Sequence, residues 1–368
     1  MKIENQIIVL GPSLNGVGGV ANYYSNINLH SLNNISYFEV NSSEKENFLK
    51  LIFRLFSNFL KFSFIVSKKS VKIIHVNPSL DVKSFWRDAI FIIISRIFSK
   101  KIIVFFRGWE DSFEEKIKNN FLINFTFKSS YLKANRYIVL GDIFRSKLLN
   151  LGLSPTIPIS IETTVADSSF LKDFNLQNKW ISFDNEIKVL FISRIEKEKG
   201  IYISIDAFHS FYLKFPSIKI KLVVAGSGKE LNLVKDYVNT KKIENIEFVG
   251  YVKSEQKGSL LHDCHIMLFP TYYGEGLPNS ILEGMLYGMP IISRINAGIP
   301  DIVKDDINGF ITNSLDPNVF CNYLEKIILD KSKYLEMSKV NYETALNRFT
   351  SDKVKERLLN IYSILNNK

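Results

Sequence analysis

The chain has 368 residues, enough for about two domains of ordinary size. With 46% hydrophobic and 23% charged residues it has the composition of a folded globular protein, and no uncharged apolar run reaches the roughly 18–20 residues that span a bilayer. Two cysteines, Cys264 and Cys321, are too few for a disulfide framework and indicate a reducing compartment. These counts exclude a secreted, fibrous or membrane-spanning protein.

The net charge of +10 is concentrated in the first half of the chain. Residues 1–165 hold 21 Lys and Arg against 12 Asp and Glu, whereas residues 166–368 hold 26 against 25. The excess in the first half indicates either an anionic partner (nucleic acid, a membrane surface or a phosphorylated substrate) or a lysine-rich solvated surface. Because its cations are scattered singly through apolar stretches, we expect no nucleic-acid partner.

Short apolar runs alternate with longer amphipathic stretches, which predicts an α/β chain with mostly parallel sheets. Met1–Leu10 lacks a small-residue cleavage site, so it is predicted to hold a first strand rather than a signal peptide. The strands expected in the first half are Gln6–Leu10, Lys72–Val76, Lys101–Phe106 and Arg136–Leu140. Those expected in the second half are Lys188–Ile192, Lys219–Ala225, Glu247–Val249, Ile266–Phe269 and Pro290–Ser293. The polar stretch Asp167–Asn185 separates the two series, and we place the domain boundary there.

The segment Phe48–Val66 is predicted to be a helix with a wide Phe/Leu/Ile face. Lys50, Arg54, Asn58 and Lys61 recur every three or four residues and form its polar stripe. A cationic stripe beside an apolar face is typical of an interfacial membrane helix. The same pattern also fits a helix that covers a sheet, which is the interpretation we favour.

A glycine-rich loop, GPSLNGVGGVANYY, follows the first strand at residues 11–24. Gly16, Gly18 and Ala21 satisfy G-x-G-x-x-A, and Glu39 follows about twenty residues later, as in a dinucleotide-binding fold. The loop is several residues longer than that fold allows, however. Its glycines therefore either let backbone amides approach an anion at a helix N-terminus or form a flexible connection.

Two cations follow the first strand of the second half. Arg194 and Lys199 lie five residues apart in a loop that opens a helix, and cations beside a helix N-terminus favour a diphosphate. The next strand ends in Gly226-Ser227-Gly228, a second loop that permits close backbone approach.

Two glutamates occupy the Gly/Pro-rich loop and the helix after Phe269. Glu275 precedes the helix and Glu283 lies within it, so both can face one cleft at different depths. Carboxylates accept hydrogen bonds from vicinal hydroxyls of sugar and ribose. They could equally be a capping acid and a solvated helix residue, but apolar neighbours around Glu283 favour a paired, functional carboxylate.

The run His262-Asp263-Cys264-His265 resembles a metal-binding cluster. It lies just before a strand, where successive side chains diverge, so we predict capping or packing and no metal.

The ordered set of motifs resembles the retaining glycosyltransferases of family 4 (glycosyl transferases group 1), which have the GT-B fold. The motifs are the glycine loop, Arg194…Lys199-Gly200, Ala225-Gly226-Ser227-Gly228, Phe248-Val249-Gly250-Tyr251, the run from Pro270 to Glu283, and Ala297-Gly298-Ile299-Pro300. The resemblance implies two facing Rossmann-like α/β domains with parallel sheets and a C-terminal helix that crosses back to the first. It divides the chain into an acceptor-side domain (1–170), a nucleotide-sugar-binding domain (185–348) and that helix (349–368).

The resemblance also implies roles for single residues. Arg194 and Lys199 neutralise the diphosphate leaving group, with no metal required, and Glu275 is the third catalytic residue. Glu283 binds the ribose hydroxyls. Donor contacts further come from Gly16, Gly18, Gly19, Gly226, Gly276, Leu277 and Asn279, and from the backbone near Val252 that meets the base.

The chain departs from the family pattern at two places. Arg107 stands where the family commonly has a His near the reacting sugar; it is a candidate acceptor-side residue that supplies charge but no neutral imidazole. Ser160–Asp167 replaces the family's Pro-Asn-Gly-Val-Asp turn, so a donor contact from that turn is not expected.

The expected function is metal-independent, retaining transfer of a hexose-type sugar. The donor is a nucleotide diphosphate sugar, with UDP-sugar favoured over GDP-sugar, and the acceptor is a saccharide or lipid-linked intermediate of a capsule, lipopolysaccharide or other cell-surface polysaccharide. We expect no separate cofactor, an anionic membrane surface against the first domain, and a cytoplasmic location, peripheral at the inner face of the cell membrane. The alternative is an NAD-dependent oxidoreductase using the Gly16–Ala21 loop, which leaves Arg194, Lys199 and both glutamates unexplained.

Overall fold

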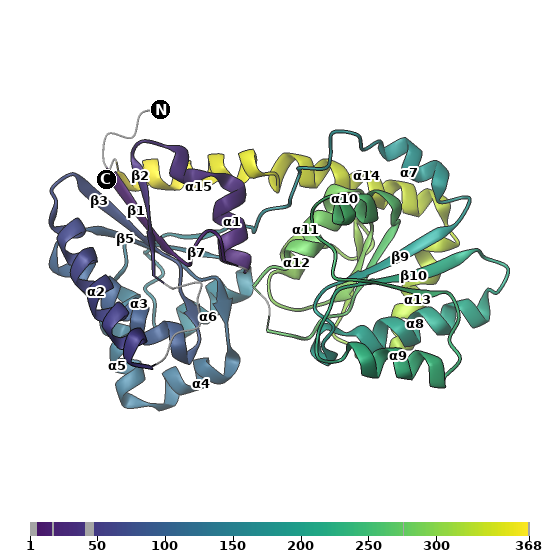
Figure 1. The fold of residues 1–368 in the computed structure, drawn as a ribbon, viewed down its shortest axis with the longest axis horizontal. Helices are drawn as coiled ribbons and strands as arrows, with labels where there is room; N and C mark the ends of the chain where they lie inside the picture. Colours follow the sequence, from purple (N-terminus) through teal and green to yellow (C-terminus); the bar gives the residue numbers. More distant parts are fainter. Residues whose placement is uncertain (1–5, 17, 41–47, 275, 367–368) are drawn as a thin grey trace. The chain divides into compact units, whose positions relative to one another are not determined.

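The computed structural model describes residues 6–16, 18–40, 48–274 and 276–366. It contains two compact units, each built on one parallel sheet: the chain up to Thr164 together with the segment from Asp352, and Val165–Ser351 (Figure 1). Glu275, predicted as a catalytic residue, lies outside the described residues.

The first unit is a parallel sheet with strand order β2-β1-β3-β5-β7-β8. Its strands are β1 (Gln6–Gly11), β2 (Ile35–Glu39), β3 (Val71–Val76), β5 (Lys101–Phe105), β7 (Arg136–Val139) and β8 (Ile159–Ile161), and β4 (Ser79–Leu80) pairs separately with β6 (Gly108–Trp109). Its helices are α1 (Gly19–Ile27), α2 (Phe48–Ser67), α3 (Val82–Ile97), α4 (Asp111–Asn119), α5 (Phe121–Ser129), α6 (Asp142–Asn150) and α15 (Ser351–Asn366), with short turns η1 (Leu29–Ser31) and η2 (Tyr131–Lys133).

The direction of each crossover decides which face of this sheet a helix covers. The chain moves from β1 to its neighbour β2 through α1, and then in the opposite direction through α2, α3 and α5. Because crossovers between parallel strands are right-handed, α1 covers one face and α2, α3 and α5 cover the other. Figure 1 shows α2, α3 and α5 together on one side of the strands.

The second unit is also a parallel sheet, with strand order β11-β10-β9-β12-β13-β14. Its strands are β9 (Ile187–Ile192), β10 (Ile220–Ala225), β11 (Ile246–Gly250), β12 (Ile266–Phe269), β13 (Ile291–Arg294) and β14 (Gly309–Thr312). Its helices are α7 (Leu176–Ser182), α8 (Ile201–Lys214), α9 (Leu231–Thr240), α10 (Ser254–Asp263), α11 (Asn279–Leu286), α12 (Ile299–Ile302), α13 (Pro317–Ile328) and α14 (Lys331–Arg348), with the turn η3 (Lys197–Lys199). The strand order reverses between β9 and β12, and in such sheets ligands bind outside the carboxyl ends of the strands at that point.

The predicted α/β architecture with two parallel sheets is confirmed. Each predicted strand is present within about one residue of its expected ends. The sequence pattern missed β2, β4, β6, β8 and β14, which are short or carry polar residues. Within the described parts of the chain, no helix is long and apolar enough to cross a membrane.

Helix α2 is present as predicted and covers the sheet, but its buried face is narrower than the wide apolar face that was expected. Phe62 and Val66 are buried, whereas Phe53, Phe56 and Phe64 on the wide apolar face are 61–76% exposed. Arg54, assigned to the solvated stripe, is half-buried and donates from Nη1 to the Val40 carbonyl oxygen at 2.9 Å. The helix therefore covers the sheet with a narrow face and leaves much of its apolar surface outside.

Candidate active site

Arg194 and Lys199 lie where β9 ends, beside the point where the strand order reverses. Arg194 follows the strand and pairs with Glu196, with 2.8 Å between Nη1 and Oε1. Lys199 ends η3 and is only 5% exposed. Both cations lie over the ring of Tyr273, from the loop after β12, at 5.1 Å for Arg194 and 4.1 Å for Lys199. The structure thus brings two predicted residues together and adds Tyr273, which the sequence patterns did not single out.

The loop after β9 is held against the loop after β10. Gly226 has a positive φ of 143°, and a Cβ there would lie 1.8 Å from the Ser193 carbonyl oxygen. Its backbone N–H donates to the carbonyl oxygen of Gly250 at 2.7 Å, while Ile195 N–H donates to Ser227 at 2.9 Å. Only glycine fits this close approach, so Gly226 fixes the backbone on which Arg194 is mounted.

The loop after β12 is tied to both of its neighbours. Tyr272 N–H donates to the Glu198 carbonyl oxygen at 2.9 Å, which links it to η3. On the other side Asn296 donates from Nδ2 to the Tyr273 carbonyl oxygen at 2.7 Å, and Gly298 N–H donates to Gly276 at 3.0 Å. These bonds position Tyr273 under the two cations.

Glu283 is buried in the second turn of α11, with 4% of its surface exposed. Lys257 of α10 pairs with it, at 2.5 Å between Nζ and Oε1. Burial raises the pKa of Glu283, and the Lys257 ammonium opposes part of that rise. The expectation that Glu283 is a paired carboxylate in apolar surroundings is met, by a lysine that sequence reasoning did not identify.

The remaining predicted donor-binding residues of this unit lie near the same ends of the strands. Val252, half-buried, comes two residues after β11. Leu277 is 5% exposed, and Asn279 is the first residue of α11, whose N-cap Pro278 offers no side-chain hydrogen bond. The first backbone amides of α11 therefore form a helix N-terminus suited to anions or sugar oxygens.

In the first unit, the glycine loop connects β1 to the N-terminus of α1. Gly18 and Gly19 are exposed, and a Cβ on either would meet no atom within 4 Å. At Gly16 a Cβ would lie 3.0 Å from the Ser13 carbonyl oxygen. Backbone amides at this helix N-terminus thus have room for an anion to approach.

Arg107, the candidate acceptor-side residue, is 9% exposed. Its guanidinium carbon lies 3.8 Å from the centre of the Tyr23 ring and 3.6 Å from that of Phe105, and Nε donates to Asn77 Oδ1 at 2.9 Å. Burial and this guanidinium lower the pKa of nearby His75 well below its usual value. The local arrangement is a rigid, buried cation among aromatic rings.

The histidines of the His262–His265 run contact different parts of the second unit. His262 Nε2 lies 2.7 Å from the Phe170 carbonyl oxygen. His265 Nδ1 accepts from the Lys188 backbone N–H at 3.0 Å, and its Nε2 lies 2.9 Å from Ser182 Oγ. Burial lowers the pKa of His265 to about 3, so its ring stays neutral.

The site lies within a part of the chain that matches a known family. Residues 173–344 match the family described as Glycosyl transferases group 1. The predicted resemblance is thereby confirmed over this part of the chain, which holds Arg194, Lys199 and Glu283. Assignment to family 4 and a retaining mechanism stay predictions.

Curated relatives are similar over part of their length. A putative colanic acid biosynthesis glycosyltransferase, WcaL, of Escherichia coli is 24% identical over 144 residues, 38% of this chain and 35% of the relative. The capsular polysaccharide biosynthesis glycosyltransferase CapM of Staphylococcus aureus is 24% identical over 252 residues, 66% of this chain and 65% of the relative. The chain thus spans between about a third and about two thirds of the curated relatives it matches.

Solved structures share the fold over nearly the whole chain. HepE from Anabaena in complex with UDP has a TM-score of 0.71 at 15% identity, covering 97% of this chain and 99% of that one. The lipopolysaccharide outer core galactosyltransferase WaaB has a TM-score of 0.69 at 18% identity, with 97% and 99% covered. These likenesses confirm the GT-B fold, and nothing in the comparisons supports the oxidoreductase alternative.

Proposed function

We propose that the protein is a glycosyltransferase that moves a hexose-type sugar from a nucleotide diphosphate sugar to a saccharide or lipid-linked acceptor in cell-surface polysaccharide synthesis. The observation that carries the proposal is the convergence of Arg194 and Lys199 over Tyr273, at the ends of β9 and β12. The names of WcaL and CapM and the UDP bound by HepE support it.

Arg194 and Lys199 stabilise the charge that develops on the diphosphate as the glycosidic bond to the donor breaks. Fixed cations aimed at developing charge lower the barrier because they need no reorganisation during the reaction. Lys199 is largely withdrawn from water, which strengthens its field. Two fixed cations replace the charge that a divalent ion would supply, so we propose a metal-independent reaction.

The other side chains hold the two ends of the donor. The Glu283 carboxylate accepts hydrogen bonds from the ribose hydroxyls, and Glu275 with the amides of Gly276, Leu277 and Asn279 holds the sugar. Backbone groups near Val252 meet the base, and UDP is the favoured nucleotide because HepE binds it. Attack by the acceptor hydroxyl on the face from which the diphosphate leaves retains the anomeric configuration, and the departing phosphate oxygen takes the proton.

Buried free thiols at Cys264 and Cys321 fit a cytoplasmic location.

The test is release of nucleoside diphosphate from a panel of UDP- and GDP-sugars, with and without saccharide acceptors and with and without EDTA. We expect release from a UDP-sugar that an acceptor accelerates and EDTA leaves unchanged. Complete loss of release in EDTA would contradict metal independence, and no release from any donor would contradict the transferase itself.

A further inference from the structure

The helices on one face of the first sheet carry large apolar side chains on their outer sides. On α2 these are Phe53, Phe56, Leu60 and Phe64, each between 57% and 76% exposed. On α3 they are Trp86, Ile90, Ile93 and Ile97, each between 39% and 71% exposed. On α5 Phe121, Leu122 and Phe125 are 59–86% exposed. We call these side chains together the apolar face.

The helices that carry the apolar face lie on the same side of the sheet. The Phe91 ring of α3 packs 4.9 Å from both Phe59 and Phe62 of α2. On its other flank, α3 is bonded to the end of α5, because Arg96 donates to the Ser129 carbonyl oxygen. The shared direction of the crossovers places all of these helices on the same side of the sheet. The outer sides of α2 and α3 therefore adjoin, with α5 on the same side of the sheet, and together they expose more apolar area than the scattered apolar residues of an ordinary soluble surface.

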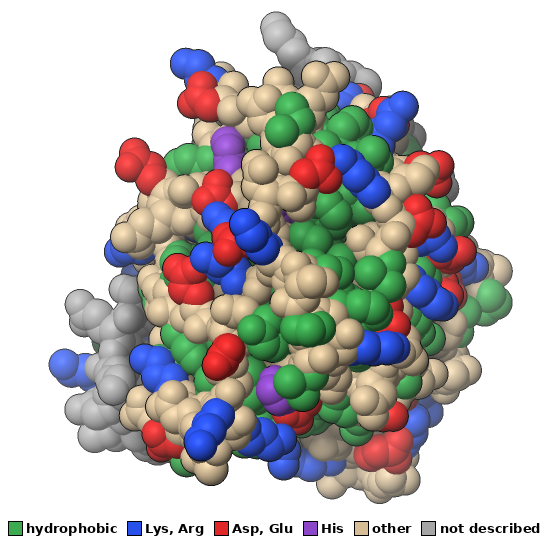
Figure 2. All heavy atoms as spheres, turned by 90° about the vertical axis from the view of Figure 1, so that its right-hand side faces the viewer, with side chains coloured by type: hydrophobic (Ala, Val, Ile, Leu, Met, Phe, Trp, Pro, Cys, Tyr) green, Lys and Arg blue, Asp and Glu red, His purple; other side chains and the backbone are tan. Residues whose placement is uncertain are grey.

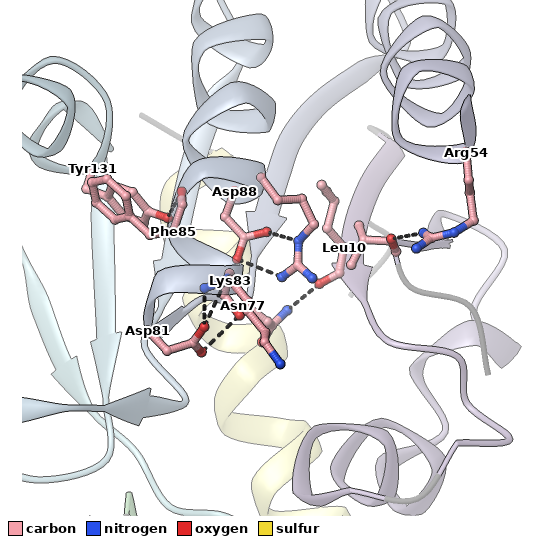
Figure 3. A network of polar contacts seen from close by, with 11 residues as sticks. Leu10, Arg54, Asn77, Asp81, Lys83, Phe85, Asp88 and Tyr131 are labelled. Carbon is pink, nitrogen blue, oxygen red and sulfur yellow. Dashed lines mark hydrogen bonds and ion pairs between the residues drawn. The ribbon is translucent and has the colours of Figure 1, made fainter. Parts of the chain in front are cut away.

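The way α2 is turned shows that this exposure is specific. Arg54 reaches inward to the Val40 carbonyl oxygen (Figure 3), while Phe53 and Phe56 beside it point to solvent. A helix that only covers a sheet does the reverse, with its polar residues outside. Here a cation is held by the protein and aromatic rings face out.

The charged residues within the three helices that carry the apolar face are nearly all basic. Asp88 is the sole acidic residue in the sequences of α2, α3 and α5. It is 2% exposed and pairs with Arg87, at 2.7 Å between Nε and Oδ1, on the inner side of α3 (Figure 3). Exposed lysines occur along the same helices and just after α2: Lys50, Lys61, Lys68, Lys83 and Lys128. By contrast, acidic and basic side chains are interspersed on the face drawn in Figure 2.

We propose that the apolar face docks on the surface of a lipid bilayer that contains anionic lipids. Aromatic and aliphatic side chains that enter the boundary between headgroups and acyl chains, rimmed by lysines, are the composition of interfacial helices. A second copy of the chain fits poorly, because α2, α3 and α5 of both copies would bring lysines together, while Asp88, the acidic residue of these helices, is buried in its pair with Arg87. The inference deepens the proposed function, since it makes the acceptor a lipid-linked one that the enzyme meets at the membrane.

The test is flotation of the full chain with vesicles of phosphatidylglycerol and phosphatidylethanolamine, compared with vesicles of phosphatidylcholine, at low and high salt. The wild-type protein floats with the anionic vesicles, and more at low salt. The double variant Phe56→Glu/Phe64→Glu should partition onto the vesicles at least about tenfold less. It removes apolar area that the bilayer would bury and adds negative charge that anionic lipids repel. Lys61→Glu/Lys128→Glu, which keeps the apolar side chains, loses binding mainly at low salt.

The matched control is Leu213→Glu/Leu233→Glu, which changes two side chains of the second unit that are 65% and 59% exposed. It floats like the wild type. Equal flotation of Phe56→Glu/Phe64→Glu and wild type overturns the proposal. The proposal is also overturned if the wild-type protein binds no vesicles but forms a concentration-dependent dimer that Phe56→Glu/Phe64→Glu abolishes. Binding of a soluble nucleotide-sugar and release of nucleoside diphosphate from it are measured without vesicles. A failure of the transferase proposal is therefore distinguished from a failure of membrane docking.

Discussion

Lys257 on α10 and Glu283 on α11 form an ion pair with 2.5 Å between Nζ and Oε1. The glutamate side chain is 5% exposed and the lysine side chain 24%, so the lysine lies on the solvent side of a buried carboxylate. The pair with Lys257 fixes the orientation of this carboxylate, as recognition of two neighbouring hydroxyls requires.

Glu283→Ala should weaken binding of the nucleotide-sugar by about 10- to 100-fold, the range for lost hydrogen bonds to a charged group. Titration calorimetry with UDP and a UDP-sugar measures it. Glu255→Ala, an exposed acid on the same α10, is the control and should bind normally. Wild-type affinity of Glu283→Ala would contradict the ribose role.

Lys257→Met should destabilise the protein by about 3 kcal/mol or more, because it leaves a buried carboxylate unpaired. Glu283→Gln should be milder, since its partner lysine can reach water. Chemical denaturation of both variants provides the comparison. Equal stability of Lys257→Met and wild type would show that the ion pair is not needed for folding.

Arg194→Ala and Lys199→Ala should each lower kcat by about 100-fold, the usual scale for removing one group that stabilises transition-state charge. Lys197→Ala, in the same turn but exposed, should leave kcat within about twofold of wild type. Release of nucleoside diphosphate under saturating donor measures all of them. A similar effect of Lys197→Ala would mean that general positive charge, rather than these two placed cations, supports turnover.

Gly226→Ala should lower the free energy of unfolding by about 2 kcal/mol or more, because its Cβ would collide with the Ser193 carbonyl oxygen in a backbone conformation that disfavours side chains. Gly19→Ala is the matched control, since a Cβ there meets nothing within 4 Å. Its unfolding free energy should be within about 0.5 kcal/mol of wild type. Denaturant titration distinguishes the two, and an unchanged midpoint for Gly226→Ala would refute the close approach.

Stability should rise with pH in the alkaline range because of Lys179. This lysine is 3% exposed, donates from Nζ to the carbonyl oxygens of Leu261 and Tyr287, and burial lowers its pKa to about 7. The unfolded chain holds the proton up to its ordinary pKa, so between these values the unfolded state binds more protons. The contribution of Lys179 to the free energy of unfolding should therefore increase from about pH 7 upward, by up to about 1.4 kcal/mol per pH unit, and level off below pH 7, where both states hold the proton.

Lys179→Met is the control for the predicted increase of the free energy of unfolding with pH. Its stability should depend less on pH between about 7 and 10 than that of the wild type, since no proton is taken up at this position. Urea unfolding at several pH values measures both proteins. Parallel pH profiles would show that Lys179 does not titrate in the folded state.

The sequence specified the sheets well because most strands are unbroken Val/Ile/Phe runs covered on both faces. It missed β2, which reads Ile-Ser-Tyr-Phe-Glu, and β8, which lies beside a proline, because neither forms such a run. The outer side of α2 was mispredicted since hydrophobic periodicity shows that a helix has an apolar face but not what that face contacts.

In the candidate site, the residues carried by loop motifs were predictable and their partners were not. Arg194, Lys199 and Glu283 belong to short patterns with a chemical reason. Lys257 comes from a polar stretch with no motif, and α10 reaches Glu283 only through the tertiary fold. Tyr273 is likewise positioned by bonds from η3 and Asn296, far apart in sequence.

The most direct test of the central claim is thermal protection by UDP, a UDP-sugar and NAD, measured on wild type, Lys199→Ala and Lys197→Ala. At about 100 times its dissociation constant a ligand adds about 2.7 kcal/mol to stability, enough to raise Tm by several degrees. UDP and the UDP-sugar should protect wild type and Lys197→Ala, and much less Lys199→Ala, while NAD should protect none of them. Protection by NAD, or equal protection of Lys199→Ala and wild type by UDP, would contradict a nucleotide-sugar site at the ends of β9 and β12.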